Sequence, residues 1–162
     1  MLNFYNFHNK KLDKYDQLFD EIQNWNNCNW SYHFQHLPNI IKRIPRDAYL
    51  YAKYVIMGRW PEVEPVIMMN SHYAYQYAKN VLQKRWLDAE PYIMKDLYRA
   101  YEYARDVING RWLEVEPLII KDARYSGIYA RDVIKERWIE AESYMDEKCV
   151  SHRFYKARFG IC

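Results

Sequence analysis

Small and apolar side chains recur along this chain in a pattern that repeats every 26 residues. The pattern is clearest where an Arg-Trp pair opens each copy, at Arg59, Arg85, Arg111 and Arg137. One period before Arg59 begins at residue 33, and one period counted from Arg137 ends at residue 162. The sequence therefore predicts a leading segment, residues 1–32, followed by five tandem units. The units are residues 33–58, 59–84, 85–110, 111–136 and 137–162.

The second half of each unit has the spacing of an amphipathic helix. With the Arg of the Arg-Trp pair as position 1, positions 16, 19, 20, 23 and 24 are apolar or small in the first four units, except at Ser126. These offsets match the i, i+3, i+4, i+7, i+8 spacing of a helix with one buried face. The sequence therefore predicts a long helix in each unit. In the third unit this face consists of Ala100, Tyr103, Ala104, Val107 and Ile108.

Capping residues mark where the long helices should begin and end. Asn70, Asp96 and Asp122 stand where a side-chain acceptor satisfies the free backbone donors of a first helical turn. Pro45 suits the first turn of the first long helix, because its fixed φ is already helical. Gly58 and Gly110 follow the last apolar pair, so we expect them to leave the helix with positive φ.

The first half of each unit predicts a shorter helix. Trp60, Val63 and Ile67 have the spacing i, i+3, i+7. In the second, third and fourth units a proline follows the glutamate at position 6. It must lie in the first turn of the short helix, because an interior proline breaks a helix. These prolines are Pro65, Pro91 and Pro117.

A hairpin of two such helices cannot bury its apolar face alone, so the units are expected to stack. The predicted fold is all-α, an α-solenoid of five 26-residue helix-turn-helix repeats with an N-terminal capping helix. Residues 11–25 suit that cap because Leu12, Tyr15, Phe19 and Ile22 share one face. The fifth unit departs from the pattern after residue 150, as a terminal unit should.

Composition narrows the function classes. Aromatic residues make up 18% of the chain, with 17 Tyr and 6 Trp, while only four glycines are present and none lies near another. A glycine-rich phosphate-binding loop is therefore excluded, and with it the P-loop and dinucleotide-binding classes. The net charge of +3 neither demands a nucleic-acid partner nor suggests disorder.

Cysteine and histidine spacing gives little support to a metal site. Cys28, Cys149 and Cys162 are far apart and form no CxxC pair, so we expect reduced thiols in a cytoplasmic protein without a leader or a membrane span. His33 and His36 after Cys28, or Cys149 with His152, each provide only half of a zinc site. We expect no metal, no cofactor and no enzymatic activity.

Arginine at position 1 recurs together with glutamate at position 6. Because charge and countercharge repeat together, the pattern favours a ladder of ion pairs between adjacent units. The alternative is a row of acids that binds a cation or a basic partner. The glutamates are Glu64, Glu90, Glu116 and Glu142.

Tyrosines at position 17 precede a basic residue at i+4, and these pairs form a second set of candidate functional residues. Aromatic rings interleaved with cations are typical of grooves that bind RNA or single-stranded DNA, although each Tyr could equally flank the core. Asp106 and Asp132 interrupt the positive charge, so nucleic-acid binding is the alternative rather than the leading hypothesis. Its residues would be Lys42, Arg43, Arg46 and Lys53.

Positions 14 and 18 vary most between units and lie beside these tyrosines. Because stacking does not constrain variable positions, we expect a concave surface there that binds a protein, either from the host or another copy of the chain. The predicted partner-binding residues are His72, Tyr75, Gln76, Lys79, Tyr98, Tyr101, Glu102, Arg105, Arg124, Ile128 and Arg131.

The unit R-W-x-E-x-E-P-x-I-x-K-D-x-x-x-A-Y-x-Y-A-R-D-V-I, best seen from Arg85 to Ile108, resembles tandem helical repeats of largely uncharacterised bacteriophage, other viral and bacterial proteins. The resemblance covers roughly residues 46–142 and implies no catalytic residues. It implies a phage-encoded accessory protein that binds and inhibits a host defence or regulatory factor in the host cytoplasm.

Overall fold

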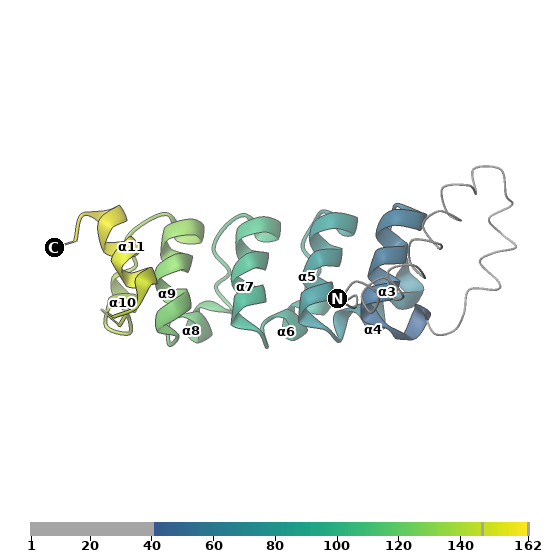
Figure 1. Cartoon of the computed structure of the whole chain (residues 1–162), viewed down its shortest axis with the longest axis horizontal. Helices are drawn as coiled ribbons and strands as arrows, with labels where there is room; N and C mark the ends of the chain where they lie inside the picture. Colours follow the sequence, from purple (N-terminus) through teal and green to yellow (C-terminus); the bar gives the residue numbers. More distant parts are fainter. Residues whose placement is uncertain (1–40, 147, 162) are drawn as a thin grey trace, which may run out of the picture. The chain divides into compact units, whose positions relative to one another are not determined.

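The computed structural model describes residues 41–146 and 148–161, and every regular element in these ranges is helical (Figure 1). The chain divides into two units, Met1–Pro38 and Asn39–Cys162, and the described residues all belong to the second. The predicted capping helix over residues 11–25 and the predicted boundary at residue 33 lie outside the described residues.

Long helices recur once in each unit, as the apolar spacing predicts. In the first four, an α-helical segment passes directly into a π-helical one, which widens the last turn. The segments are α3 (Pro45–Tyr51) with η3 (Ala52–Ile56), α5 (Ser71–Tyr77) with η5 (Ala78–Leu82), α7 (Leu97–Tyr103) with η7 (Ala104–Ile108), and α9 (Ala123–Tyr129) with η8 (Ala130–Ile134). The last long helix, α11 (Val150–Phe159), has no π-helical segment.

Short helices occupy the first half of the units, and two of them follow a turn of 3-10 helix. Pro65, Pro91 and Pro117 each stand in the first turn, as expected from the missing amide hydrogen of proline. The elements are η2 (Ile41–Arg43), η4 (Pro61–Val63) with α4 (Glu64–Met68), η6 (Leu87–Ala89) with α6 (Glu90–Ile93), α8 (Glu116–Ile119) and α10 (Ile139–Glu142).

The predicted helix starts are confirmed. The side chain of Asn70 accepts a hydrogen bond from the Tyr73 amide, and that of Asp96 accepts from two amides of the first turn of α7. Asp122 accepts from the Arg124 amide at 2.9 Å. Pro45 opens α3. Each long helix except α11 therefore begins where the sequence places a cap.

The predicted helix ends at Gly58 and Gly110 are wrong by one residue. The left-handed residue is the one before, at Met57 with φ 54° and Asn109 with φ 55°. The same conformation recurs at Gln83 and Lys135. The π-helical last turn is the reason, because the Gly58 amide donates to the Ala52 carbonyl at 3.1 Å across the widened turn. The reversal therefore comes one residue before the glycine.

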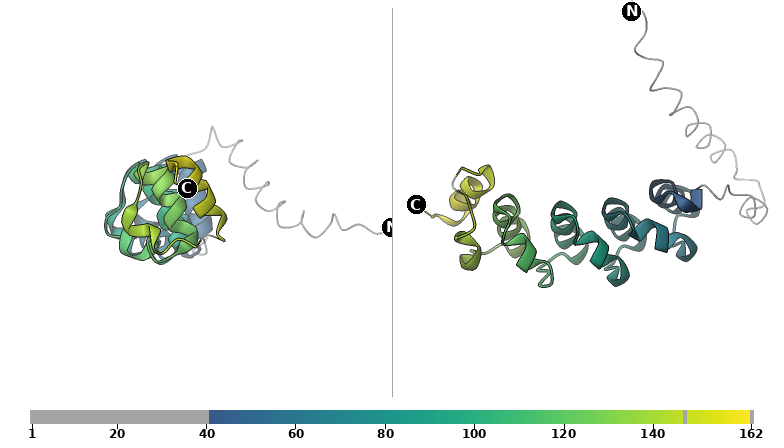
Figure 2. Two further views of the ribbon diagram at one scale, coloured as in Figure 1. Left: turned by 90° about the vertical axis from the view of Figure 1, so that its left-hand side faces the viewer. Right: turned by 90° about the horizontal axis from the view of Figure 1, so that it is seen from below.

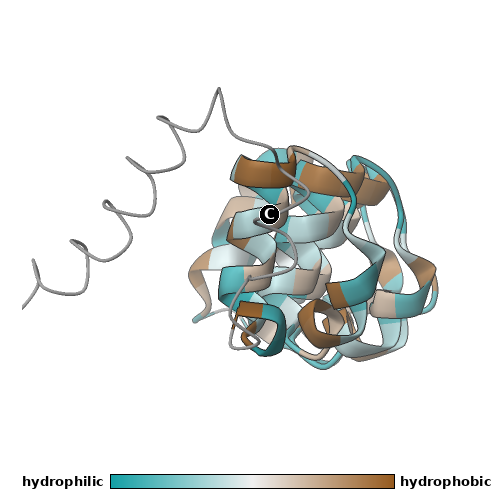
Figure 3. Ribbon diagram, turned by 90° about the vertical axis from the view of Figure 1, so that its right-hand side faces the viewer, coloured by the Kyte–Doolittle hydropathy of each residue, from teal (hydrophilic) through white to brown (hydrophobic). Residues whose placement is uncertain are grey.

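The core lies between the long and the short helices. Ala74, Tyr77 and Ala78 on α5 and η5 are fully buried, whereas Val81 and Leu82 in the widened turn are only half-buried. The long helices follow one another in chain order, and the short helices lie along one side of that row (Figures 1 and 2). Seen along the row, hydrophobic and hydrophilic stretches alternate along the ribbon (Figure 3).

The fourth unit differs from the others in order to receive α11. Gly127 stands where earlier units have tyrosine, and a Cβ at this position would lie 3.0 Å from the Ser151 carbonyl oxygen. The Ser151 hydroxyl donates to the Ala123 carbonyl at 3.0 Å. Gly127 and buried Ser126 therefore let the backbones of α9 and α11 approach closely.

Candidate functional site

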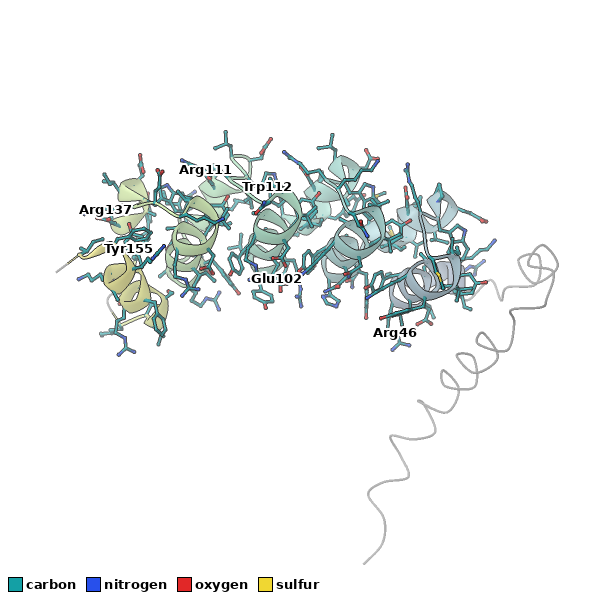
Figure 4. All side chains as sticks on the ribbon, turned by 90° about the horizontal axis from the view of Figure 1, so that it is seen from above. Arg46, Glu102, Arg111, Trp112, Arg137 and Tyr155 are labelled. Carbon is teal, nitrogen blue, oxygen red and sulfur yellow. The ribbon has the colours of Figure 1, made fainter. Side chains whose placement is uncertain are left out.

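A cluster of four residues closes each of the four units that begin with Arg-Trp. In the third unit the Trp86 amide donates to the Tyr103 hydroxyl at 2.6 Å, and that hydroxyl donates to Glu90 Oε1 at 3.1 Å. Arg85 then donates two hydrogen bonds to the same carboxylate, at 2.9 and 2.8 Å. The same contacts recur around Glu64, Glu116 and Glu142, and Figure 4 shows Arg137 and Tyr155 of the last set.

The ion pairs between position-1 arginines and position-6 glutamates therefore lie within units, and the predicted ladder of these pairs between adjacent units is wrong. Five residues separate Arg59 from Glu64, so the 3-10 turn between them brings the guanidinium back onto the carboxylate of its own unit. Burial raises the pKa of Tyr77 to about 12, because the phenol is enclosed beside that carboxylate. The bond from Arg137 lowers the pKa of Glu142 to about 2. These groups hold the fold together.

A second set of contacts joins the second unit to the third and the third unit to the fourth. The Tyr75 hydroxyl donates to Asp106 Oδ2 at 2.6 Å, and Tyr101 donates to Asp132 Oδ2 at 2.7 Å. Lys79 also donates to Asp106 Oδ2, at 2.7 Å. Hydrogen bonds from Arg105 and Lys79 hold the pKa of Asp106 well below its usual range. The position-17 tyrosines and their basic neighbours therefore help to hold successive units together.

Because they hold units together, the position-17 tyrosines and their basic neighbours are not available to bind a ligand. The Tyr75 and Tyr101 side chains are only 2% and 5% exposed, so neither ring is available to a base or to a partner. Arg105 and Arg131 each bind the adjoining aspartate. Buried rings and paired cations provide no stacking platform for a single-stranded nucleic acid.

Three of the four residues of the nucleic-acid alternative contact other side chains. Lys42 donates to Glu62 at 2.8 Å, and Arg46 donates to Asp47 at 2.9 Å. The Lys53 ammonium lies over the Tyr54 ring, 4.8 Å from its centroid. Arg43 is exposed. These cations lie in the first unit and do not extend as a positive surface along the row.

Among the variable positions, Tyr98 and Arg124 keep the most exposure. Tyr98 is 41% exposed, its ring lies 6.3 Å from that of Tyr125, and Arg124 pairs with Asp122. The other predicted residues at these positions are half-buried, and two of them have partners inside the chain. They are His72, Gln76 with Asn80, Glu102 with Arg99, and Ile128. In Figure 4, Glu102 lies on the side of the row opposite Arg111 and Trp112.

The outer side of the short helices has a feature that the sequence interpretation missed. Position 3 of four successive units is apolar and exposed, with Leu87, Leu113 and Ile139 between 66% and 67% exposed. We call these residues the apolar row: Pro61, Leu87, Leu113 and Ile139. Two residues at position 8, Leu118 and Tyr144, are also exposed. The row was missed because positions kept in every unit were assigned to stacking.

Acidic residues accompany the apolar row at position 4. We call them the acidic row: Glu62, Asp88, Glu114 and Glu140, all exposed. Glu62 pairs with Lys42, but in the described part of the chain Asp88, Glu114 and Glu140 form no ion pair. Each position-1 arginine already binds the position-6 glutamate of its own unit, so the arginines form no ion pair with the acidic row.

Two expectations concern metals and membranes. In the described residues, no group of three or more His, Cys, Asp or Glu side chains could hold a metal ion. Cys28, His33, His36 and Cys162 lie outside the described residues, and His152 is buried. None of the described helices combines the length and the apolar character that crossing a membrane requires.

The geometry of these residues is the basis for assigning a function. Comparison with known protein families, with curated proteins and with solved structures finds no match to this chain.

Proposed function

We propose that residues 33–162 form an α-solenoid of five 26-residue units, capped by the leading segment, that binds a protein through the outer side of its short helices. The proposal makes the chain a non-enzymatic binding module. Because the units resemble bacteriophage repeats, we further propose that the chain is a phage-encoded accessory protein that binds and inhibits a host factor. The apolar and acidic rows replace the variable positions as the proposed contact surface.

The exposure of the apolar row is the observation that supports this proposal. Single exposed apolar side chains are ordinary, but here one recurs at the same position of four consecutive units. Leu87, Leu113 and Ile139 contribute little to their own units, because about two thirds of each side chain faces solvent. Apolar anchors of this kind supply most of the binding energy at protein interfaces.

A protein partner fits this surface better than a nucleic acid does. Phosphates would meet the carboxylates of Asp88, Glu114 and Glu140 at close range and be repelled. The position-17 tyrosines Tyr49, Tyr75 and Tyr101 are buried, so their rings cannot stack on bases. Binding through apolar side chains also predicts tolerance of salt, because the hydrophobic contribution is not screened.

Affinity purification from a native-host lysate tests the proposal with the chain and two double variants. Leu87→Ser with Leu113→Ser removes the centre of the apolar row, and both side chains are exposed, so folding should be retained. The wild-type chain should capture a discrete protein after nuclease treatment and in about 0.5 M salt. The double variant should lose it, with an unchanged helical circular dichroism spectrum.

The matched control changes the variable positions on the long helices instead of the short helices. Tyr98→Ser with Arg124→Ser alters two exposed side chains at the variable positions and should leave capture intact. Loss of capture in this control alone would move the contact surface to the long helices. Recovery of nuclease-sensitive RNA or DNA alone would contradict protein binding and support the nucleic-acid alternative.

A further inference from the structure

The last long helix, α11, has an exposed apolar face. It is the last described element of the chain, and its inner side packs on α9. Val150, Phe154 and Ala157 have the helical spacing i, i+4, i+7, and all three are exposed, Val150 by 53% and Phe154 by 57%. The terminal unit of a repeat stack needs a polar outer face, because no further unit covers it. The apolar outer face of α11 therefore calls for a partner.

Two arginines flank this apolar face. A helix turns by about 100° per residue, which places Arg153 and Arg158 along opposite edges of the stripe formed by Val150, Phe154 and Ala157. Both arginines are exposed, and neither forms an ion pair with any residue that the structure describes. The helix carries three cations and no acidic residue. Its outer face is therefore both apolar and basic.

The other charged residues near α11 do not neutralise its arginines. Those on the elements packed against α11 are paired with one another or lie close to an opposite charge, and Glu147 lies outside the described residues. They are Arg124 with Asp122, Arg131 with Asp132, Arg137 with Glu142, Lys135 beside Glu136, Asp146 near Lys148, and Glu140, whose charge acts on Arg111.

A second copy of α11 does not suit this face. Two such helices packed face to face would bring Arg153 and Arg158 of one copy against the same residues of the other. Like charges placed opposite each other repel, and α11 has no acidic residue to offset them. The occupant of the face therefore needs an apolar stripe together with a net negative charge.

Residues 11–25 of the same sequence have this chemistry. The sequence predicts that their apolar residues Leu12, Tyr15, Phe19 and Ile22 share one helical face. Four acids stand against two lysines in the segment, which gives it a net charge of −2. The acids are Asp13, Asp16, Asp20 and Glu21, and the lysines are Lys11 and Lys14. In a helix, Asp16 and Asp20 lie one turn apart along one edge of the apolar face, and the lysines lie towards the other edge.

The position of α11 in the row indicates which copy supplies this segment. The helices α3 and α11 lie at opposite ends of the row of long helices (Figure 1). Residues 11–25 precede the first unit in the sequence, so a chain's own segment would have to pass along the whole row to reach α11. A second copy brings its segment to this end without that constraint.

We propose that residues 11–25 of one copy form a helix that covers the face of α11 in a second copy, with Asp16 and Asp20 beside an arginine at its edge. The copies then join head to tail, and the leading segment of a neighbour caps each solenoid. Because the contact joins two different surfaces, it produces open chains or closed rings of copies. The inference goes beyond the proposed function, since it uses neither the apolar row nor the acidic row.

Sedimentation equilibrium of the full chain tests this inference. The average mass of the wild-type chain should rise with concentration above that of a monomer. Arg153→Glu with Arg158→Glu changes α11, and Asp16→Lys with Asp20→Lys changes the leading segment. Each double variant alone should associate at least about tenfold more weakly, because attractive contacts become repulsive. Circular dichroism checks that both variants keep the helical content of the wild type.

Mixing the two charge-reversed chains is the decisive measurement. The acidic α11 of one variant then meets the basic leading segment of the other, and the two unchanged surfaces also meet, so association should return. A wild-type chain that stays monomeric at every concentration would overturn the inference. So would a mixture that does not associate. Wild-type association of the Asp16→Lys, Asp20→Lys chain alone would show that the leading segment is not the occupant.

Two further variants separate this inference from the proposed function. Leu87→Ser with Leu113→Ser should associate as the wild type does, because the apolar row takes no part in the contact between copies. Val150→Ser with Phe154→Ser should lose association and still capture the protein from lysate. Loss of association in the first variant would overturn the inference, whereas loss of capture in that variant is what the proposed function requires.

Discussion

The tyrosines at positions 17 and 19 of a unit make different contacts, as the third unit shows. Tyr103 at position 19 binds the Trp86 amide and Glu90 inside its own unit, whereas Tyr101 at position 17 reaches Asp132 in the next one. The sequence predicts burial of the first because it lies on the apolar face of the helix. It does not predict burial of the second, because its acceptor lies 31 residues away and only the stacking of units brings the two together.

At the residue scale, Tyr103→Phe tests the contact within a unit. The substitution leaves the buried Trp86 amide without its acceptor, so the free energy of unfolding should fall by about 1–3 kcal/mol. Chemical denaturation followed by circular dichroism measures the change. Tyr98→Phe is the matched control, because its ring is 41% exposed, and it should change stability little. Equal effects of the two substitutions would show that the hydroxyl of Tyr103 contributes nothing.

At the scale of the element, helix starts are predictable from this sequence and helix ends are not. Asn70, Asp96 and Asp122 cap the helices as expected, because capping depends on residues close in sequence. The π-helical last turns were not predicted, since the left-handed positions hold non-glycine residues such as Gln83 and Lys135. That conformation comes from the packing of the turn rather than from the residue that adopts it.

The contact between α9 and α11 gives a prediction at this scale. Gly127→Ala places a Cβ 3.0 Å from a backbone oxygen of α11, which cannot move aside as a side chain could. We expect a loss of about 1–3 kcal/mol and faster amide exchange across residues 150–159. Gly110→Ala is the control, because nothing lies within 4 Å of its added Cβ. Unchanged exchange in α11 after Gly127→Ala would contradict the close approach of the two helices.

At the scale of the whole molecule, the repetition of charged and phenolic contacts predicts a stability that falls at both ends of the pH range. The pKa of Glu142 falls from 4.5 to about 2, chiefly through the bond from Arg137. A lowered pKa gives stability that is present above pH 4.5 and is lost as pH falls towards 2. Asp106 contributes in the same direction, because the Arg105 bond lowers its pKa.

At alkaline pH the pKa shifts have the opposite sign, so stability is lost as the pH rises. Burial raises the pKa of Tyr77 and Tyr155 from 10.0 to about 12. A raised pKa gives stability that is complete below pH 10 and is lost as pH rises to about 12. Thermal melting from acid to alkaline pH, together with tyrosinate absorbance, measures both limbs. A midpoint that stays constant between pH 10 and pH 12 would contradict the enclosed tyrosines.

Comparing the units within one sequence did not reveal the apolar and acidic rows. Identity between units was taken as a sign of stacking, which holds for Trp86 and Glu90 because both are buried. It fails for Leu113 and Glu114, which recur in kind in the three other units that begin with Arg-Trp but face solvent. A position can be kept because each unit stacks or because each unit binds, and burial distinguishes the two.

The central claim is that a protein partner lies on the apolar and acidic rows. Hydrogen–deuterium exchange of the chain, alone and with the partner captured from lysate, tests it most directly. We predict new protection in the short helices of residues 87–93 and 116–119, with the first turns of α7 and α9 unchanged. Protection confined to those first turns, around Tyr98 and Arg124, would contradict the claim.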